Sequence, residues 1–529
     1  MRGAAKSGMT PALLSEIIPT EGEFTMKTKR VLCAVLSALM LLILFAGCGE
    51  SKENNDLPSG SDVPSGSAAD NAQTPGAEAE AETEPEEETM IDRVPELNFG
   101  GETLTMAGQG TGDEGNNNLD MTVEEMTGDV VRDAIYQRTV AMEERFNIKI
   151  AEPLMADYGT ISSTVRSMVT AGDHTYDFVV NQLAQTSADV LNGHSMNLNE
   201  IPYLDFDMRW YPANVKESAS LNGKLYLIVS DMCLSYVGQT WSMCFNKDLT
   251  TDLGIEGLYD LAREGRWTLD QLTALTADLY FDLNGDGQRD EEDRYGFTMG
   301  KEGVSGCLGA AVLYGAGQRY LDVNDDFSID LLLDSEHAQN LCEKLYQLNN
   351  QPGSTVYDTS GRRTITAMMD GVAVFTPAQL GYYYVFARDF DGTFGVLPMP
   401  KFDETQERYA TLCDAGCNCI SVPITLKNPE LTGALIEAMS AYSANYVNPA
   451  YVDVSLQTKV ARDVESSEMM QIVLDSRVMD FGYLYCGWGG WTWQLKDMFK
   501  DPGTYASSLK RTEKLMAKTY DKIIKTFTD

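Results

Sequence analysis

The residues best suited to chemistry lie in one acidic stretch, FDLNGDGQRDEEDRYGF, at residues 281–297. Calcium prefers oxygen ligands spaced along a twelve-residue loop, with a glycine at the sixth position for the sharp turn. Gly287 occupies that sixth position. Oxygen ligands follow the calcium spacing at positions one, three, five, seven (a backbone carbonyl), nine and twelve, namely Asp282, Asn284, Asp286, Gln288, Asp290 and Asp293. The sequence therefore predicts a calcium site in this loop.

This loop differs from calcium sensors in its last ligand. Position twelve is Asp293 rather than the bidentate glutamate of sensors, and the stretch DVNDDFSID has Phe327 where a second loop would need glycine. Extracellular calcium modules bind weakly, with dissociation constants on the order of 0.1–1 mM, so we expect a structural staple rather than a sensor. The alternative is an acidic turn without metal, because such turns are common in an acidic chain.

Cysteines form the second group of candidate ligands. The chain has ten, and CDAGCNC brings Cys413, Cys417 and Cys419 together. A zinc site would need a fourth ligand at a recognised spacing, and the sequence offers none nearby. Small buried residues are the other interpretation, with Cys417 and Cys419 on the same side of a strand.

The charge balance limits the partners. The 529 residues include 79 acidic and 40 basic side chains, for a net charge of -39, which repels phosphate backbones and anionic lipid head groups over the surface as a whole. We therefore expect no nucleic-acid partner. Only three histidines are present, which leaves little room for histidine-based triads.

The N-terminal region carries an export signal. Residues 26–48, MKTKRVLCAVLSALMLLILFAGC, place lysine and arginine before an apolar run that is shorter than the roughly 20 residues needed to span a bilayer. Ala46-Gly47-Cys48 resembles the bacterial lipobox, so we expect lipid on Cys48, with plain secretion as the alternative. We expect Met26 to be the true start and residues 1–25 to be a misplaced upstream extension. Residues 49–96, rich in Ser, Gly, Pro and Glu, are expected to form a disordered tether.

The folded body must supply the elements that position these residues. ETLTMAG alternates like a strand, DVVRDAIYQRTVAMEERF has helical spacing with Asp129 as a plausible N-cap, and IKIAEP resumes as a strand. A second helix leads into the short apolar run YDFVV, typical of a buried parallel strand. Alternating strands and helices indicate an α/β fold whose ligand site lies at the carboxyl ends of the strands.

Six segments resemble the signature segments of family 1 extracellular solute-binding proteins, and they occur in the same order. These proteins are the lipoprotein receptors of bacterial ABC importers. The segments are RTVAMEERFNIKI, AGDHTYDFVV, LNGKLYLIVSD, MCFNKDL, REGRWTLDQLTALT and FGVLPMPKFD. The resemblance implies a two-lobe periplasmic-binding-protein-like α/β fold with crossing hinge strands. It implies that 97–230 and 412–481 form lobe one, while 231–411, including the loop 282–293, and 482–529 form lobe two.

The resemblance also implies a function and a set of ligand residues. A monomer on the outer face of the cytoplasmic membrane would capture a small solute, most plausibly a sugar, and deliver it to membrane permease subunits. Sugars stack on aromatic rings while carboxylates and amides take their hydroxyl groups. The expected ligand residues are Asp231, Gln239, Trp241, Gln379, Tyr382, Tyr383, Trp488 and Trp491. The alternative for each ring is a place in the hydrophobic core.

Two other functions compete with solute binding. A secreted carbohydrate-active hydrolase would use two carboxylates, but no motif singles out a pair in a chain so rich in acids. A calcium-stabilised adhesion or scaffold protein would be expected to show repeats, and none is evident in the sequence.

Overall fold

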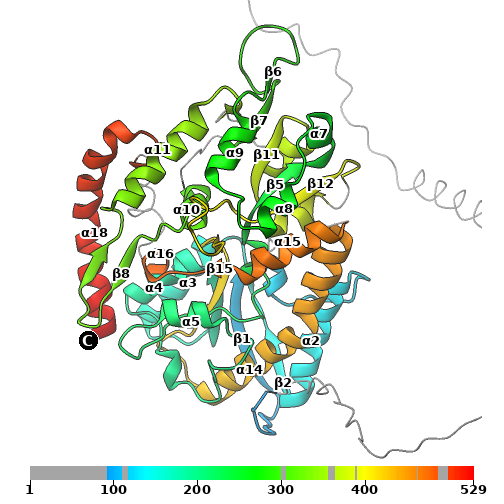
Figure 1. Cartoon of the computed structure of the whole chain (residues 1–529). Helices are drawn as coiled ribbons and strands as arrows, with labels where there is room; N and C mark the ends of the chain where they lie inside the picture. Colours follow the sequence, from blue (N-terminus) through cyan, green and yellow to red (C-terminus); the bar gives the residue numbers. More distant parts are fainter. Residues whose placement is uncertain are drawn as a thin grey trace, which may run out of the picture. The chain divides into compact units, whose positions relative to one another are not determined.

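The computed structural model describes residues 92–109, 117–299, 306–355, 364–387, 390–460, 463–485 and 498–528. Two separate sheets dominate this part of the chain, each flanked by helices (Figure 1). The first has the strand order β14-β4-β1-β2, with β3 pairing to β1, and the second has the order β10-β7-β11-β5-β12, with β6 pairing to β7. The α/β class and the two-lobe plan expected from the sequence are confirmed.

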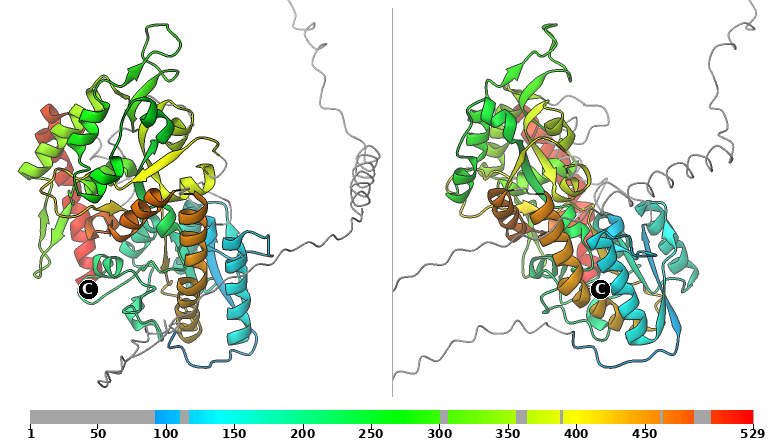
Figure 2. Two further views of the ribbon diagram at one scale, coloured as in Figure 1. Left: turned by 45° about the vertical axis from the view of Figure 1, so that its right-hand side comes forward. Right: turned by 90° about the vertical axis from the view of Figure 1, so that its right-hand side faces the viewer.

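The first sheet is mainly parallel. Strand β1 runs parallel to β2, β3 and β4, and β14 runs antiparallel to β4. Its strands are β1 (Glu102–Gln109), β2 (Ile148–Ala151), β3 (Leu154–Met155), β4 (Phe178–Gln182) and β14 (Asn418–Ser421). Its helices include α2 (Val130–Phe146), α3 (Tyr158–Ala171), α4 (Leu183–Leu191), α5 (Ala213–Ala219) and α14 (Pro429–Tyr442), and α14 lies beside α2 (Figure 2).

Helix α2 forms where its sequence predicts. Asp129 caps it by accepting hydrogen bonds from the backbone N–H groups of Val131 and Arg132. The residues at helical spacing along one side are all buried, namely Val131, Ile135, Arg138, Met142 and Phe146. The apolar members of this stripe pack into the core, and the buried arginine among them needs polar partners.

The second sheet is mixed. Strand β5 runs antiparallel to both β11 and β12, whereas β7 runs parallel to β10 and β11. Its strands are β5 (Trp241–Asn246), β6 (Tyr280–Phe281), β7 (Arg294–Thr298), β10 (Ser354–Thr355), β11 (Ala373–Gln379) and β12 (Phe394–Leu397). Its helices include α7 (Lys247–Asp252), α8 (Leu258–Arg263), α9 (Leu269–Thr276), α10 (Gly306–Gly315), α11 (Glu336–Asn350) and α12 (Thr364–Met369). The hairpin of β8 (Leu321–Val323) and β9 (Ile329–Leu331) projects from this lobe.

Crossing segments join the two sheets. The first follows Ile228, which bridges to Ile420 of β14, and passes through the short helix α6 (Ser235–Gly238) into β5. The second returns through β13 (Thr411–Leu412) to β14. An antiparallel bridge between Thr240 and Cys413 joins the two crossings, so they form one narrow hinge.

The later boundaries differ from those implied by the resemblance. Helix α15 (Val464–Asp475), inside the stretch 412–481, packs on β12 of lobe two, where Tyr259 and Ser466 share a hydrogen bond of 2.8 Å between their hydroxyl oxygens. Helix α16 (Phe481–Tyr485) lies at the expected boundary of 482, where the chain should enter lobe two. It contacts lobe one instead, with the Tyr485 hydroxyl donating to the Ala219 carbonyl at 2.8 Å. The chain therefore crosses between lobes more often than expected.

Candidate functional site

The hinge brings three of the expected ligand residues together. Trp241 begins β5 and Gln379 ends β11, and the two are directly opposite each other in the antiparallel register. The indole Nε1 of Trp241 donates to Asp414 Oδ2 at 3.2 Å, and the Asp414 N–H donates to the Gln239 carbonyl at 2.9 Å. We call Gln239, Trp241, Gln379 and Asp414 the junction site. All four residues are buried.

Asp414 is the centre of this site and was missed by the sequence reasoning. Its Oδ1 accepts the Gly416 N–H at 2.7 Å while Oδ2 accepts the Trp241 indole, so both oxygens hold the hinge in one arrangement. The residue belongs to the CDAGCNC stretch, which drew attention only for its cysteines. An aspartate two residues before a glycine, at the start of the return crossing, was the available signal.

Gln379 has an unused acceptor. Its side chain is only 4% exposed, and its Oε1 has no hydrogen-bond partner among the described residues. A buried polar atom without a partner costs roughly 1–3 kcal/mol. Gln379 Oε1 is one of several such atoms among the described residues, and it is the one that lies in the junction site. A ligand hydroxyl could donate to this oxygen, as the sequence-based role of Gln379 requires.

A buried carboxylate connects the hinge to lobe one. Asp120, in the short helix η1 (Asn117–Asp120) after β1, accepts from the Ser235 N–H at 2.9 Å and from the Ser235 hydroxyl. It also accepts from Asn418 Nδ2 at 2.9 Å, and the Ser235 hydroxyl oxygen accepts the Asn418 N–H at 2.9 Å. Asp120 thus holds the first crossing and the return crossing together.

Burial governs the protonation of this region. Desolvation raises the pKa of Asp120 to about 7, although its hydrogen bonds and the nearby Arg138 act in the opposite direction. Desolvation also raises the pKa of Glu152 to about 7 and lowers that of Arg138 to about 10. The Arg138 guanidinium is fixed by the Ser443 hydroxyl at 3.1 Å and the Met121 carbonyl at 3.1 Å.

Asp231 lies in a different polar group. Its Oδ1 accepts from Asn448 Nδ2 at 2.8 Å, and its own N–H donates to the Trp210 carbonyl at 2.9 Å. Desolvation raises the pKa of Asp231 to about 6, opposed by the charges of Arg477 and Arg209. Within the described part of the chain, its hydrogen bonds are with this group rather than with the junction site.

The tyrosine stretch after β11 is mostly core, which corrects one expectation. The Tyr383 ring is fully buried, stacks on Phe394 at 5.5 Å between centroids, and shares a 3.0 Å hydrogen bond with the Ser242 hydroxyl. Phe394 covers one face of this ring, and Tyr383 belongs to a hydrophobic core cluster. Tyr382 is half-buried and contacts Phe386 edge-on, while the Tyr384 hydroxyl donates to Asp129 Oδ2 of lobe one at 3.2 Å. Trp488 and Trp491 lie outside the described residues, as does Cys48.

The acidic loop has the turn that calcium loops need. Gly287 has φ +74°, a left-handed conformation that favours glycine, and its N–H donates to Asp282 Oδ2 at 2.9 Å. Asp293 is buried and accepts from the Tyr280 hydroxyl at 2.9 Å. Among the described residues, no group of three or more His, Cys, Asp or Glu side chains is arranged to hold a metal ion. The calcium site therefore remains a prediction.

The clustered cysteines were considered as zinc ligands or as small buried residues. The hinge buries three free thiols completely, those of Cys413, Cys417 and Cys419. Cys419 lies within β14, and Cys417 directly precedes this strand. Burial raises the pKa of Cys419 to about 12, which disfavours the thiolate that a metal would need. Small buried residues are the interpretation that this packing favours.

Comparison with known proteins identifies solved structures with a similar fold. The sequence matches no protein-family model and no curated protein. The galacto-N-biose-/lacto-N-biose I-binding protein of a Bifidobacterium longum ABC transporter, in complex with lacto-N-biose, is similar in structure with a TM-score of 0.53 at 12% identity, over 80% of this chain and 98% of that one. UgpB from Mycobacterium tuberculosis, in complex with glycerophosphocholine, gives 0.52 at 13% identity over 74% and 97%. The Listeria monocytogenes ABC substrate-binding protein Lmo0181, in complex with cycloalternan, gives 0.50 at 16% identity over 80% and 99%.

The chain has the fold of ABC substrate-binding proteins. In this substrate-binding-protein fold the junction site lies where the crossing segments connect the two lobes. No helix in the described part of the chain is long and apolar enough to span a membrane.

Proposed function

We propose that this protein is the extracellular solute-binding component of an ABC importer. It captures a carbohydrate at the junction site and delivers it to the permease subunits without chemical turnover. The observation that carries the proposal is the combination of an indole ring, amide side chains and a carboxylate at the hinge, with Gln379 Oε1 buried and lacking a donor. Such a set can hold a polyol with an apolar face.

The solved structures of the same fold support a carbohydrate. Two of those compared are complexes with saccharides, lacto-N-biose and cycloalternan, while a third holds glycerophosphocholine. The fold alone does not fix the solute. The four junction residues include one carboxylate and no cationic side chain, which favours a neutral, hydroxyl-rich solute over a phosphate-bearing one.

A thermal-shift screen tests this proposal. Neutral mono- and oligosaccharides, sugar alcohols, uronic acids and glycerophosphocholine would be compared at matched concentrations. A true ligand present at 100 times its Kd adds about 2.7 kcal/mol of stability, so it raises the Tm clearly. We expect shifts with neutral saccharides. A shift with glycerophosphocholine and none with any saccharide would contradict the proposed solute class.

Two further features are proposed from the sequence. We propose that lipid on Cys48 anchors the mature, monomeric protein to the outer face of the cytoplasmic membrane. The tether predicted at 49–96 ends earlier than expected, because Asp92 pairs with Arg145 at 2.6 Å and Val94 is buried, so we propose residues 49–91 for it. We also propose that calcium occupies the 282–293 loop as a structural staple, supported by the ligand spacing and by the left-handed Gly287.

A further inference from the structure

The last helix, α18 (Tyr505–Thr528), has a charge unlike the rest of the chain. It carries six basic and two acidic side chains, in a protein with nearly twice as many acids as bases. Its buried residues recur at helical spacing on one side: Tyr505, Ser508, Leu509, Thr512, Met516, Ile523 and Phe527. The opposite side is exposed and carries the acids Glu513 and Asp521 together with the cations Lys510, Arg511, Lys514, Lys518, Lys522 and Lys525. We call these six cations the basic face.

The five lysines of the basic face are incompletely neutralised along the helix, because only Asp521 on this face and Glu513 at its border carry the opposite charge. Lys510, Lys514 and Lys518 follow one another at i, i+4 spacing, so like charges are neighbours, which destabilises a helix slightly. Within the described residues, no ion pair involves any lysine of α18. Lys522 Nζ instead donates to the amide oxygen of Asn192 at 2.7 Å. A row of cations arranged in this way is suited to an external anion.

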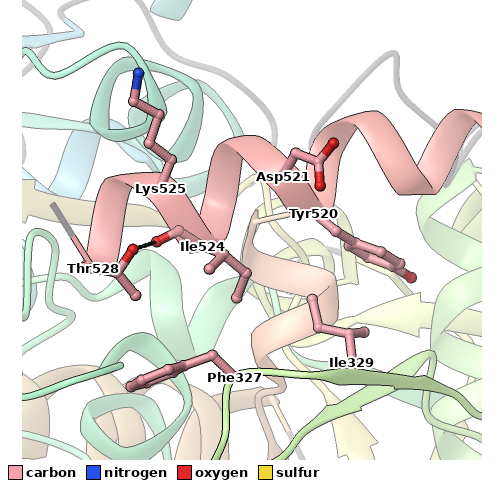
Figure 3. Close-up of a pocket in the computed structure, with 7 residues that line it drawn as sticks. All are labelled: Phe327, Ile329, Tyr520, Asp521, Ile524, Lys525 and Thr528. Atoms are coloured by element: carbon pink, nitrogen blue, oxygen red, sulfur yellow. Dashed lines mark hydrogen bonds between the residues drawn. The ribbon is translucent and has the colours of Figure 1, made fainter.

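A groove with both apolar and charged lining residues lies beside the C-terminal end of the basic face. A hollow of about 480 Å³ separates α18 from the β8–β9 hairpin. Figure 3 shows Ile524 and Tyr520 turned toward Phe327 and Ile329 of the hairpin, whereas Lys525 points away from them. The lysines thus form an exposed surface separate from the side chains that pack toward the hairpin.

We propose that the basic face of α18 docks on an anionic phospholipid surface. Attraction of this kind depends on local rather than net charge, because charges farther than about 8 Å are largely screened at physiological ionic strength. Helix α18 lies along the flank of the molecule (Figure 1) and is about 36 Å long, so several lysines reach one plane together. The overall net charge of -39 still opposes adsorption through any other face.

The length of chain before the first described residue allows this orientation. About 43 residues separate Cys48 from Asp92, which span up to about 150 Å when extended. Lipid on Cys48 would therefore not prevent α18 from reaching the same membrane. The docking proposal itself requires neither the lipid nor a particular solute, so it can fail without affecting the proposed function.

The test is co-sedimentation of the mature chain, residues 48–529 with Cys48→Ser, with vesicles, so that neither the apolar signal nor lipid contributes to binding. Vesicles of phosphatidylcholine with 30% phosphatidylglycerol are compared with pure phosphatidylcholine, at low and at physiological salt. We expect binding only to the anionic vesicles, weakening as salt rises. The double variant Lys514→Glu/Lys518→Glu should reduce the bound fraction at least tenfold.

A matched control separates local from net charge. Lys427 and Arg408 are exposed and form no ion pair with described residues, so Lys427→Glu/Arg408→Glu makes the same change in net charge elsewhere. This control should alter binding less than twofold, and both doubles should keep the parent Tm. Equal losses in the two doubles, equal binding to neutral vesicles, or no binding to anionic vesicles at low salt would each overturn the proposal.

Discussion

At the scale of single residues, the buried carboxyl groups make stability depend on pH. Asp120, Glu152 and Glu437 each have a folded-state pKa of about 7, raised by desolvation, against about 4 in an unfolded chain. The folded state therefore binds more protons than the unfolded state between about pH 4 and 7. The stability that these groups contribute is complete below about pH 4 and is lost as pH rises through about 7.

We predict that the Tm falls as pH increases from 5 to 8. Each such group contributes a slope of up to about 1.4 kcal/mol per pH unit. Scanning calorimetry across this range measures the trend. Asp120→Asn should flatten it, because the replacement does not titrate. A Tm that rises steadily from pH 5 to 8 would show that these carboxyl groups are not protonated on folding.

Gln379 offers a second prediction at this scale. Replacing it with methionine removes the buried oxygen that has no partner, so the free energy of unfolding without ligand should stay the same or increase by about 1 kcal/mol. Solute affinity should fall at least tenfold, because the hydroxyl donor loses its acceptor. Titration calorimetry and melting of the same variant separate the two effects. Unchanged affinity would remove Gln379 from the site.

Residue types indicated only part of the junction site. Gln239, Trp241 and Gln379 were predicted and lie together, but Asp414 was not, because aspartate is common in this chain and carries no positional signal. The same reason left Asp120, which joins the two crossings outside this site, unpredicted. Tyr383 was misplaced since a tyrosine in an apolar run has the same pattern whether its ring faces a ligand or the core.

At the scale of elements, the 282–293 loop can be tested directly. If calcium bridges its carboxylates, chelation should lower the Tm, while solute affinity should persist because no described contact joins the loop to the junction site. Differential scanning fluorimetry with and without a chelator measures this. Asp286→Asn is the control, since it should remove most of the response. Identical melting with calcium and with chelator would leave the acidic turn as the better interpretation.

Local patterns specified most of the elements but not their partners. The Asp129 cap and the buried side of α2 follow from helical spacing, and Thr268 caps α9 by accepting from the Gln271 N–H. The assignment of α15 to lobe two depends on contacts with residues about 200 positions earlier, such as Arg263 with Glu468 at 2.7 Å. Spacing within a helix carries no information about such distant partners.

At the scale of the whole molecule, binding at a hinge implies closure. A solute that contacts both lobes stabilises the closed arrangement by its differential affinity. We predict that the radius of gyration from small-angle X-ray scattering decreases when a saccharide is added. Gln379→Met should need more saccharide for the same decrease. A radius that is unchanged at saturation would mean that binding does not move the lobes.

Anchoring gives a second prediction at this scale. Cys48→Ser should release the protein from the cell membrane into the medium, because the cysteine is the expected site of lipid attachment. Fractionation followed by immunoblotting measures the distribution. A neighbouring change, Ser51→Ala, serves as the control and should leave the protein with the membrane. Full retention of Cys48→Ser at high salt would indicate another anchor.

Helix α18 is attached to different lobes at its two ends. Near its start the Tyr505 hydroxyl donates to the Leu333 carbonyl beyond the β8–β9 hairpin, at 2.7 Å. Near its end Asn222 Nδ2 donates to the Phe527 carbonyl at 3.0 Å, and Tyr226 packs on the Phe527 ring. A rod fixed at both ends behaves as a mechanical strut. Lobe rotation about the hinge must therefore tilt this rod or release one end, which makes its two attachments the parts of the molecule that limit how far it opens.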